Sequence, residues 1–467
     1  MVIRYLDFDL LIEHSADRYR ARVLGSPAGQ ASSEFAPPFT ESEIDAFFLQ
    51  IGQTRSIESE QSRQIRQFGQ GLFEAVFSGP VRDCLRTSLS AAKAQGGGLR
   101  IRLWLADTPE LAGLPWEFIY DPETASFLAL TVQSPVVRFL EVPQPVQPLA
   151  VKPPLRILAM LCGPKDFPRL DLEYEWQNLQ ESLKGVQERG LVDLQRLYPP
   201  TLTALQEQLR REQYHVFHFI GHGIFSQRDR DGFLLFENEL HEGQRVSGRN
   251  LGSLLRDHAP LRLAVLNACE GARADMNDQF AGSAQSLIQQ GVPAVIAMQF
   301  RITDKASITL AGQFYGSLAD GYPVDAALTE ARKAIHAAGN DLEWGTPVLY
   351  MRSPDGYLFD VTAASTAGPL KPVVVGGPVG EGAVTRSAEP VSVVTRSQDE
   401  EARLKRQTEL AALDEAVLRL MADLKTLAAA SLPERGNPFL FVQPFAISDH
   451  ARFFGRDQVL ADLLDRL

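Results

Sequence analysis

The sequence predicts an α/β protein whose main domain has a largely parallel sheet covered by helices on both faces. Four short runs are mainly apolar and alternate with helical patterns: "LRILAML", "YHVFHFIG", "LRLAVLNA" and "VPAVIAMQF". A strand that is apolar on both sides belongs in the interior of a parallel sheet, where crossover helices cover both faces. Residues 151–360 are therefore expected to form one α/β domain.

Helices and further strands are expected between and after these runs. Helical patterns lie in "LEYEWQNLQESLKGV" and "TLTALQEQLRREQ", and Thr201 is suited to cap the second one. "VDLQRLY" between them has the pattern of a strand. Two long helical stretches, "KASITLAGQFYGSLAD" and "VDAALTEARKAIHAA", follow the last apolar run, and "PVLYMRS" is expected to add a final strand.

Residues 1–150 form a separate N-terminal part in this interpretation. Strand patterns occur in "IRYLDFDLLI", "YRARVLG" and "GLRIRLWLAD", with a helical region at 42–92. A turn-rich segment, "ELAGLPWEFIYDP", follows. The proline-rich "PVVRFLEVPQPVQPLAVKPP" then predicts an extended connector.

The C-terminal region has a different composition. Residues 361–398 are rich in Gly, Pro, Ser and Thr, which predicts a disordered linker. Residues 399–431 predict an amphipathic helix, because apolar residues from Leu410 to Leu427 repeat at three-four spacing. That seam either packs on its own chain or mediates self-association.

Composition excludes several classes of function. A net charge of −12 argues against nucleic-acid binding. No apolar run approaches about eighteen residues, so no membrane span and no membrane partner are expected. Only three cysteines occur, without CxxC spacing, which is typical of a reducing compartment and indicates a cytoplasmic protein. No cofactor and no metal are expected.

Three histidines lie close together in "HVFHFIGHG". Strand alternation would turn His215 away from His218 and His222, which argues against a shared metal site. His215 and His218 lie inside the apolar run and are expected to be structural. His222 stands between two glycines where the strand should end, and the carboxyl ends of parallel strands are where ligands bind. His222 is therefore expected to be exposed and reactive.

Cys269 has a similar setting, because "NACEGA" leads the chain out of the apolar run "LRLAVLN". Cys84 falls in a helical pattern and Cys162 at an apolar strand, and both are expected to be inert core thiols. An imidazole that takes the thiol proton makes cysteine a strong nucleophile. The separation of His222 and Cys269 leaves room for the crossover that adjacent parallel strands need. The alternative is a turn cysteine without chemistry.

At these motifs the sequence resembles the CHAT branch of the caspase-like cysteine proteases, which is found in bacteria and is related to separase. The resemblance spans about residues 100–360 and includes "HVFHFIGHG", "LNACEGA", "LIQQGVPAVIAMQFRITDKAS", "LAGLPWEFIYDP" and "SPVVRF". It implies a caspase-like fold, with a pseudo-caspase half in residues 1–150 before the protease core. It also implies His222 as general base and Cys269 as nucleophile, with the N–H groups of Gly223 and Cys269 as oxyanion hole. In this clan a backbone carbonyl often orients the histidine.

The resemblance also suggests a protein substrate that is cut after a basic residue. Asp304, in "QFRITDKAS", resembles the acidic residue that receives a basic side chain in separase-like enzymes. The alternative is that Asp304 only caps the helix that starts near Lys305. Asp275 and Asp278 are weaker candidates for the same pocket.

The C-terminal "FFGRDQVLADLL" resembles the entry segment of STAND-type NTPases. Residues 432–467 are thus expected to begin such a domain and to end before its P-loop, since no GxxxxGK[ST] occurs. The resemblance implies the effector portion of a bacterial defence or cell-death sensor. A catalytically idle caspase-like scaffold is the alternative function.

Overall fold

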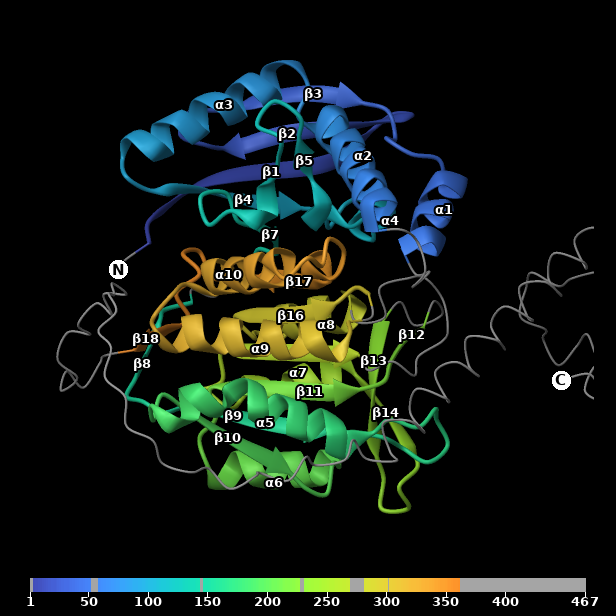
Figure 1. Cartoon of the computed structure of the whole chain (residues 1–467), viewed down its shortest axis with the longest axis vertical. Helices are drawn as coiled ribbons and strands as arrows, with labels where there is room; N and C mark the ends of the chain where they lie inside the picture. Colours follow the sequence, from blue (N-terminus) through green and yellow to red (C-terminus); the bar gives the residue numbers. More distant parts are fainter. Residues whose placement is uncertain are drawn as a thin grey trace, which may run out of the picture. The chain divides into compact units, whose positions relative to one another are not determined.

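A computed structural model describes residues 3–51, 58–142, 146–226, 231–268, 281–300 and 302–361, all within one compact unit (Figure 1). In this part of the chain the main element is an eleven-stranded sheet in the order β10-β9-β11-β15-β16-β17-β7-β4-β1-β2-β3. The predicted α/β class, with a mostly parallel sheet flanked by helices, is confirmed. The strands of this sheet are β1 (Tyr5–Ser15), β2 (Arg18–Gly25), β3 (Ala31–Phe35), β4 (Gly98–Trp104), β7 (Val136–Phe139), β9 (Leu155–Leu161), β10 (Val192–Leu197), β11 (Val216–Gly221), β15 (Leu263–Ala268), β16 (Ala294–Met298) and β17 (Pro347–Met351).

The sheet contains two parallel blocks. Strands β10, β9, β11, β15 and β16 run parallel to one another. Strand β17 is antiparallel to β16 and parallel to β7, which continues in parallel with β4 and β1. One sheet therefore runs through both halves of the chain, and β17, which comes late in the sequence, joins the N-terminal block.

The expected extended connector is wrong in its first part. Val136 and Val137 are about 1% exposed, and β7 lies inside the sheet between β17 and β4. Pro135 directly precedes this strand, a position at which a proline removes no ladder hydrogen bond within it. Further along, β8 (Leu149–Val151) pairs with β18 (Phe359–Val361) in a separate two-stranded sheet.

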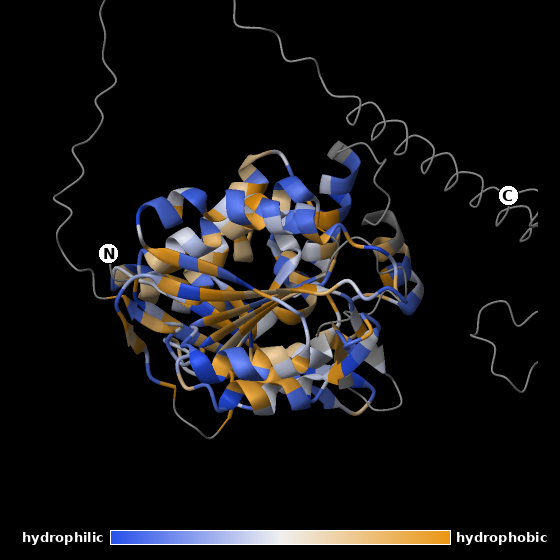
Figure 2. Ribbon diagram, turned by 90° about the horizontal axis from the view of Figure 1, so that it is seen from below, coloured by the Kyte–Doolittle hydropathy of each residue, from blue (hydrophilic) through white to orange (hydrophobic). Residues whose placement is uncertain are grey.

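Helices cover both faces of the C-terminal block, as predicted. Along β11, Val216 and Ile220 pack into the core cluster that contains residues of α5, α9 and α10, whereas Phe217 and Phe219 pack with residues of α6, α7 and α8. Figure 2 shows the hydrophobic colour concentrated on the strands between the helical layers. The helices are α1 (Glu41–Ile51), α2 (Glu58–Val76), α3 (Gly79–Ala94), α4 (Pro109–Ala112), α5 (Leu172–Glu188), α6 (Leu202–Arg211), α7 (Gly248–Arg256), α8 (Ala281–Gln289), α9 (Asp304–Ala319) and α10 (Val324–Ala337), with 3₁₀ helices η1 (Trp116–Phe118), η2 (Leu128–Leu130) and η3 (Glu343–Gly345).

The start of α6 follows from its sequence. Thr201 has an extended backbone, and its hydroxyl accepts a hydrogen bond from the N–H of Ala204. This contact satisfies one of the amide groups that a helix leaves unpaired at its first turn. The predicted cap is confirmed.

A small antiparallel sheet stands where β11 ends, and the sequence analysis did not predict it. It consists of β12 (Gly223–Ser226), β13 (Asp231–Glu237) and β14 (Gly243–Ser247). The N–H of Leu235 in β13 donates to the carbonyl of His222, 3.0 Å away. This sheet therefore fixes the backbone at the carboxyl end of β11.

Several predictions fall outside the described residues: the linker at 361–398 apart from Val361, which ends β18, the helix at 399–431 with its seam from Leu410 to Leu427, and the segment 432–467. The boundary at residue 150 also stays a prediction. None of the described helices is both long enough and apolar enough to span a membrane.

Candidate active site

The three clustered histidines have three different partners. The Nδ1 atom of His215 accepts a hydrogen bond from the N–H of Arg156 at 2.8 Å. The Nδ1 atom of His218 lies 2.7 Å from the Tyr315 hydroxyl. Burial lowers the pKa of both imidazoles to about 4, so both are neutral at pH 7. Both histidines have hydrogen-bond partners within the fold, which is compatible with the structural role expected of them.

His222 lies immediately after β11 and is only 2% exposed, so the prediction that it is exposed is wrong. The segment after β9 covers it: the Phe167 ring is centred 6.0 Å from the imidazole, and the Pro168 carbonyl oxygen lies 2.9 Å from Nε2. Burial lowers the pKa of His222 below its ordinary 6.5, and the hydrogen bond to Pro168 opposes that shift. The imidazole is therefore neutral near pH 7.

The Pro168 carbonyl also decides which nitrogen of His222 carries the proton. A carbonyl oxygen can only accept, so Nε2 must be the donor of this hydrogen bond. In a neutral imidazole the other nitrogen, Nδ1, is then unprotonated and basic. His222 thus has the tautomer of a general base, with a backbone carbonyl as its orienting group.

The segment that carries Pro168 is held by the small sheet. The N–H of Gly163 donates to the Glu237 carboxylate at 3.0 Å, and Glu237 is only 5% exposed. The N–H of Lys165 donates to the carbonyl of His241 at 2.9 Å. One sheet therefore holds both the backbone of His222 and the segment that orients its side chain.

The register of β11 and β15 relates the two predicted catalytic residues. These adjacent parallel strands pair Gly221 with Ala268, the residues that directly precede His222 and Cys269 in the sequence. Cys269, Asp275 and Asp278 lie outside the described residues. Gly221 is needed for close packing, since a Cβ there would lie 2.7 Å from the Phe219 ring.

The other two cysteines are buried, as predicted. Cys84 lies in α3 and Cys162 directly follows β9. Burial raises the pKa of the Cys162 thiol well above its ordinary value, which disfavours the reactive thiolate. Neither residue has the environment of a nucleophile.

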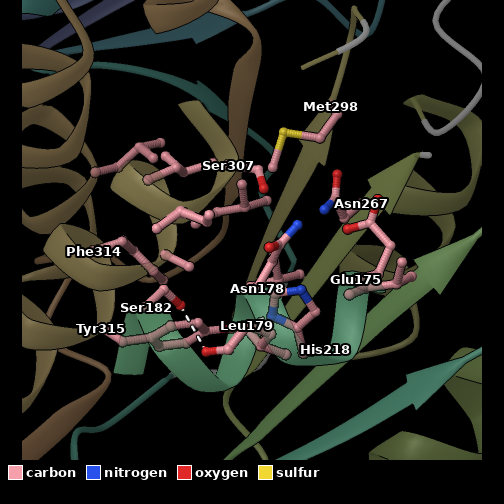
Figure 3. A pocket seen from close by; sticks show the side chains of 17 residues that line it. Glu175, Asn178, Leu179, Ser182, His218, Asn267, Met298, Ser307, Phe314 and Tyr315 are labelled. Carbon is pink, nitrogen blue, oxygen red and sulfur yellow. Dashed lines mark hydrogen bonds between the residues drawn. The ribbon is translucent and has the colours of Figure 1, made fainter. Parts of the chain in front are cut away.

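A cavity of about 30 Å³ lies beside this edge of the sheet, between the strands and helices α5 and α9 (Figure 3). Three atoms on its lining residues are buried without a hydrogen-bond partner among the described residues: Nε2 of His218, Nδ2 of Asn178 and Oδ1 of Asn267. Asn267 stands two residues before Cys269 in the sequence. The remaining lining is largely apolar, and the cavity has room for about two water molecules or for polar atoms of a ligand.

Asp304 is the first residue of α9, and it does not cap the helix. The N-cap is Thr303, whose hydroxyl accepts from the N–H of Ala306 at 3.4 Å. The alternative role of Asp304 as a cap is therefore wrong. Because residues three apart share a helix face, Asp304 lies on the side of α9 that carries Ser307, which lines the cavity.

Glu175 lines this cavity with its carboxylate, whereas Asp304 itself is not among the lining residues, and the sequence analysis missed Glu175. It comes from α5, which the chain reaches well before β11 and β15. No local pattern marks it, because only the packing of α5 on the sheet places it there. Pro168 was missed for the same reason. Within the described ranges, no three His, Cys, Asp or Glu residues are grouped so that they could hold a metal ion.

Fold and site together define an α/β protein with a buried, neutral imidazole at the carboxyl edge of a parallel sheet, next to a strand that leads to a cysteine. Residues 66–355 match the CHAT domain family. The chain belongs to this family, as the motifs indicated. No curated protein matches the chain.

Two solved structures are similar at low identity. Separase in the Saccharomyces cerevisiae separase–securin complex is 11% identical with a TM-score of 0.43, over 74% of this chain and 30% of that chain. The Arg-specific cysteine proteinase gingipain R (RGPB) is 11% identical with a TM-score of 0.36, over 68% of this chain and 75% of that chain. The chain thus spans less than a third of the length of the separase structure.

Proposed function

We propose that this protein is a caspase-like cysteine endopeptidase in which His222 is the general base and Cys269 the nucleophile. The observation that carries this proposal is the hydrogen bond from His222 Nε2 to the Pro168 carbonyl, which leaves Nδ1 as the basic atom. The pairing of Gly221 with Ala268 supports it, because the two residues follow directly on neighbouring strands. Membership of the CHAT family supports the same class.

The proposed reaction uses these groups in sequence. Nδ1 of His222 takes the proton of the Cys269 thiol, and the thiolate sulfur attacks the carbonyl carbon of the scissile peptide bond. The N–H groups of Gly223 and Cys269 stabilise the oxyanion, where loss of one donor costs about a hundredfold in rate. The imidazolium then protonates the leaving amine, and a water molecule hydrolyses the thioester.

The proposed substrate is a protein cut after a basic residue. Asp304 and Glu175 would supply carboxylates for the cationic head, and a guanidinium pairs well with carboxylates. Because the cavity has room for only about two water molecules, a basic side chain would have to widen it to place its aliphatic stem against Leu179, Ile220 and Met298. Asp275 remains a further candidate for this pocket.

We also propose a biological setting for the activity. The protease would be the cytoplasmic effector portion of a bacterial STAND-type defence or cell-death sensor. The resemblance of residues 432–467 to the start of a STAND NTPase motivates this proposal. The seam from Leu410 to Leu427 would contribute to self-association, and Arg386 and Arg396 are basic sites that a neighbouring active site could cut.

The test is an incubation of the chain with a positional library of fluorogenic peptides. Cleavage after Arg or Lys is expected, with complete loss in Cys269→Ala and retention in Cys84→Ala, which removes a buried thiol far along the sequence. Labelling with a peptidyl-arginine chloromethyl ketone is a second readout. If neither cleavage nor labelling of Cys269 occurs, the idle scaffold is the better description.

A further inference from the structure

The turn between β16 and α9, described at Gln299, Phe300, Ile302 and Thr303, leads directly to Asp304; we call it the β16–α9 loop. Gln299 follows the last residue of β16, and its side chain is fully engaged. Its amide nitrogen donates to the Glu117 carboxylate at 2.9 Å and to the Gly345 carbonyl at 2.7 Å. Its backbone N–H donates to the Thr346 carbonyl at 3.0 Å. The first end of the loop is thus held by η1 and η3.

Glu117 is itself a fixed group. It is 1% exposed and forms an ion pair with Arg138, which is 3% exposed, at 3.0 Å. Arg138 also donates to the carbonyls of Ala112 and Leu114. A buried carboxylate with several charge-assisted hydrogen bonds has little freedom to move. Glu117 and Arg138 both belong to the N-terminal half of the chain.

A second buried carboxylate holds the other end of the loop. Glu343 in η3 is 8% exposed and accepts from both the backbone N–H and the hydroxyl of Thr303, the latter at 2.8 Å. Thr303 is the N-cap of α9 and directly precedes Asp304. Glu343 therefore fixes the residue from which α9 starts.

Aromatic side chains of η1 and η3 pack against each other and against the β16–α9 loop. Phe300 stacks on Phe118 with ring centres 6.2 Å apart, and Phe118 meets Trp344 edge-on at 5.1 Å. A Cβ at Gly345 would lie 2.2 Å from the Phe118 ring, so η1 and η3 pack in direct contact. The segment "PWEF" and the segment "EWG" thus form one base for the loop.

We propose that Glu117 and Glu343 are positioning residues that hold the β16–α9 loop and thereby set the place of the Asp304 carboxylate. The N-terminal half would then contribute to substrate selection without touching the substrate. The proposed role in substrate selection rests on the proposed function. The proposal that Glu117 and Glu343 fix the β16–α9 loop does not depend on that function.

Amide hydrogen exchange of the full chain tests directly whether Glu117 fixes the β16–α9 loop. In Glu117→Gln, the amides from Ile302 to Ser307 are expected to exchange at least about tenfold faster than in the wild type, because a local opening becomes easier. The matched control is Asp325→Asn, which weakens the equally buried ion pair with Arg100; within the described residues, no hydrogen bond or ion pair of Asp325 reaches the loop. Equal exchange in both variants would overturn the proposal. Gln299→Met replaces Glu117→Gln if the latter does not fold.

Kinetics on paired peptides test the consequence for selection. Citrulline has the shape of arginine without its charge, so the ratio of kcat/KM for the two peptides reports on the carboxylate. Glu117→Gln is expected to lower this ratio about tenfold, as small displacements of a binding group do. Asp325→Asn should lose thermal stability with an unchanged ratio. An unchanged ratio in Glu117→Gln refutes the selection role, whereas an inactive wild type counts against the proposed function and leaves the exchange result to decide the holding.

Discussion

Nε2 of His222 donates to the carbonyl oxygen of Pro168 across 2.9 Å, between residues 54 positions apart in the sequence. This hydrogen bond fixes the tautomer of the imidazole and leaves Nδ1 as its basic nitrogen. Glu237 and His241 hold the segment that carries Pro168. Among the described residues, the group that orients the imidazole of His222 is therefore this backbone carbonyl.

Replacement of the base should abolish activity selectively. His222→Gln is expected to lower kcat/KM by at least about a hundredfold, since general-base catalysis contributes that much or more. His215→Gln is the matched control, because His215 lies at the other end of the same strand and also bonds to backbone. The measurement is cleavage of an arginyl peptide. Comparable losses in both variants would contradict the assignment of His222.

The pH dependence of cleavage follows from the lowered pKa of His222. Burial disfavours the imidazolium, so the base stays neutral at pH values below its ordinary pKa of 6.5. The acid limb of kcat/KM is therefore expected below pH 6.5. A profile from pH 4.5 to 8 checks it, and a limb at or above 6.5 would argue that His222 is solvated or is not the base.

Stability should fall in acid because His218 is buried as the neutral form. Its pKa is about 4 in the folded chain against 6.5 when unfolded, so between these values the unfolded state binds the additional proton. The contribution of neutral His218 to the free energy of unfolding is fully present above pH 6.5. As the pH falls to 4, its protonation in the unfolded state is expected to lower the free energy of unfolding by about 3 kcal/mol. Urea unfolding at both pH values measures this. In His218→Gln the loss should be smaller by that amount, and an equal loss would contradict the prediction.

Removal of the Asp304 charge should change the preference for a basic residue in the substrate more than it changes the stability of the fold. Asp304→Asn is expected to reduce the preference for arginine over citrulline about tenfold, the range of one charge-assisted hydrogen bond. Asp320→Asn, at the opposite end of α9, is the control. Steady-state kinetics on the two peptides decide the matter. If both variants keep the wild-type preference, another carboxylate selects the basic residue, with Glu175 and Asp275 as the next candidates.

Local sequence patterns predicted the strands that are buried on both faces and the helices that cover them. The runs that became β9, β11, β15 and β16 are apolar on both faces, and the structure buries both faces. The prediction was wrong for residues 136–139, because the prolines that follow them suggested a connector while the strand itself is short. The sheet of β12, β13 and β14 was missed, and its first strand, β12, begins two residues after the end of β11.

For the site residues too, the sequence predicted some features and the structure was needed for others. His222 was found because a strand-end histidine between glycines stands out in the sequence. The sequence did not predict the burial of His222, because the residues that cover it, Phe167 and Pro168, belong to a segment some fifty residues earlier. Asp304 was found by resemblance, but only the structure shows that Thr303 caps the helix.

The sequence by itself determined the alternation of buried strands and helices, the identity of the candidate His and Cys, and the CHAT family, because these depend on residue type and spacing along the chain. Only the tertiary structure decided that β7 and β17 bring the two halves into one sheet, that Pro168 orients His222, and that Glu117 holds Gln299. Such contacts join residues far apart in the chain. They arise from packing in three dimensions, on which local sequence patterns carry no information.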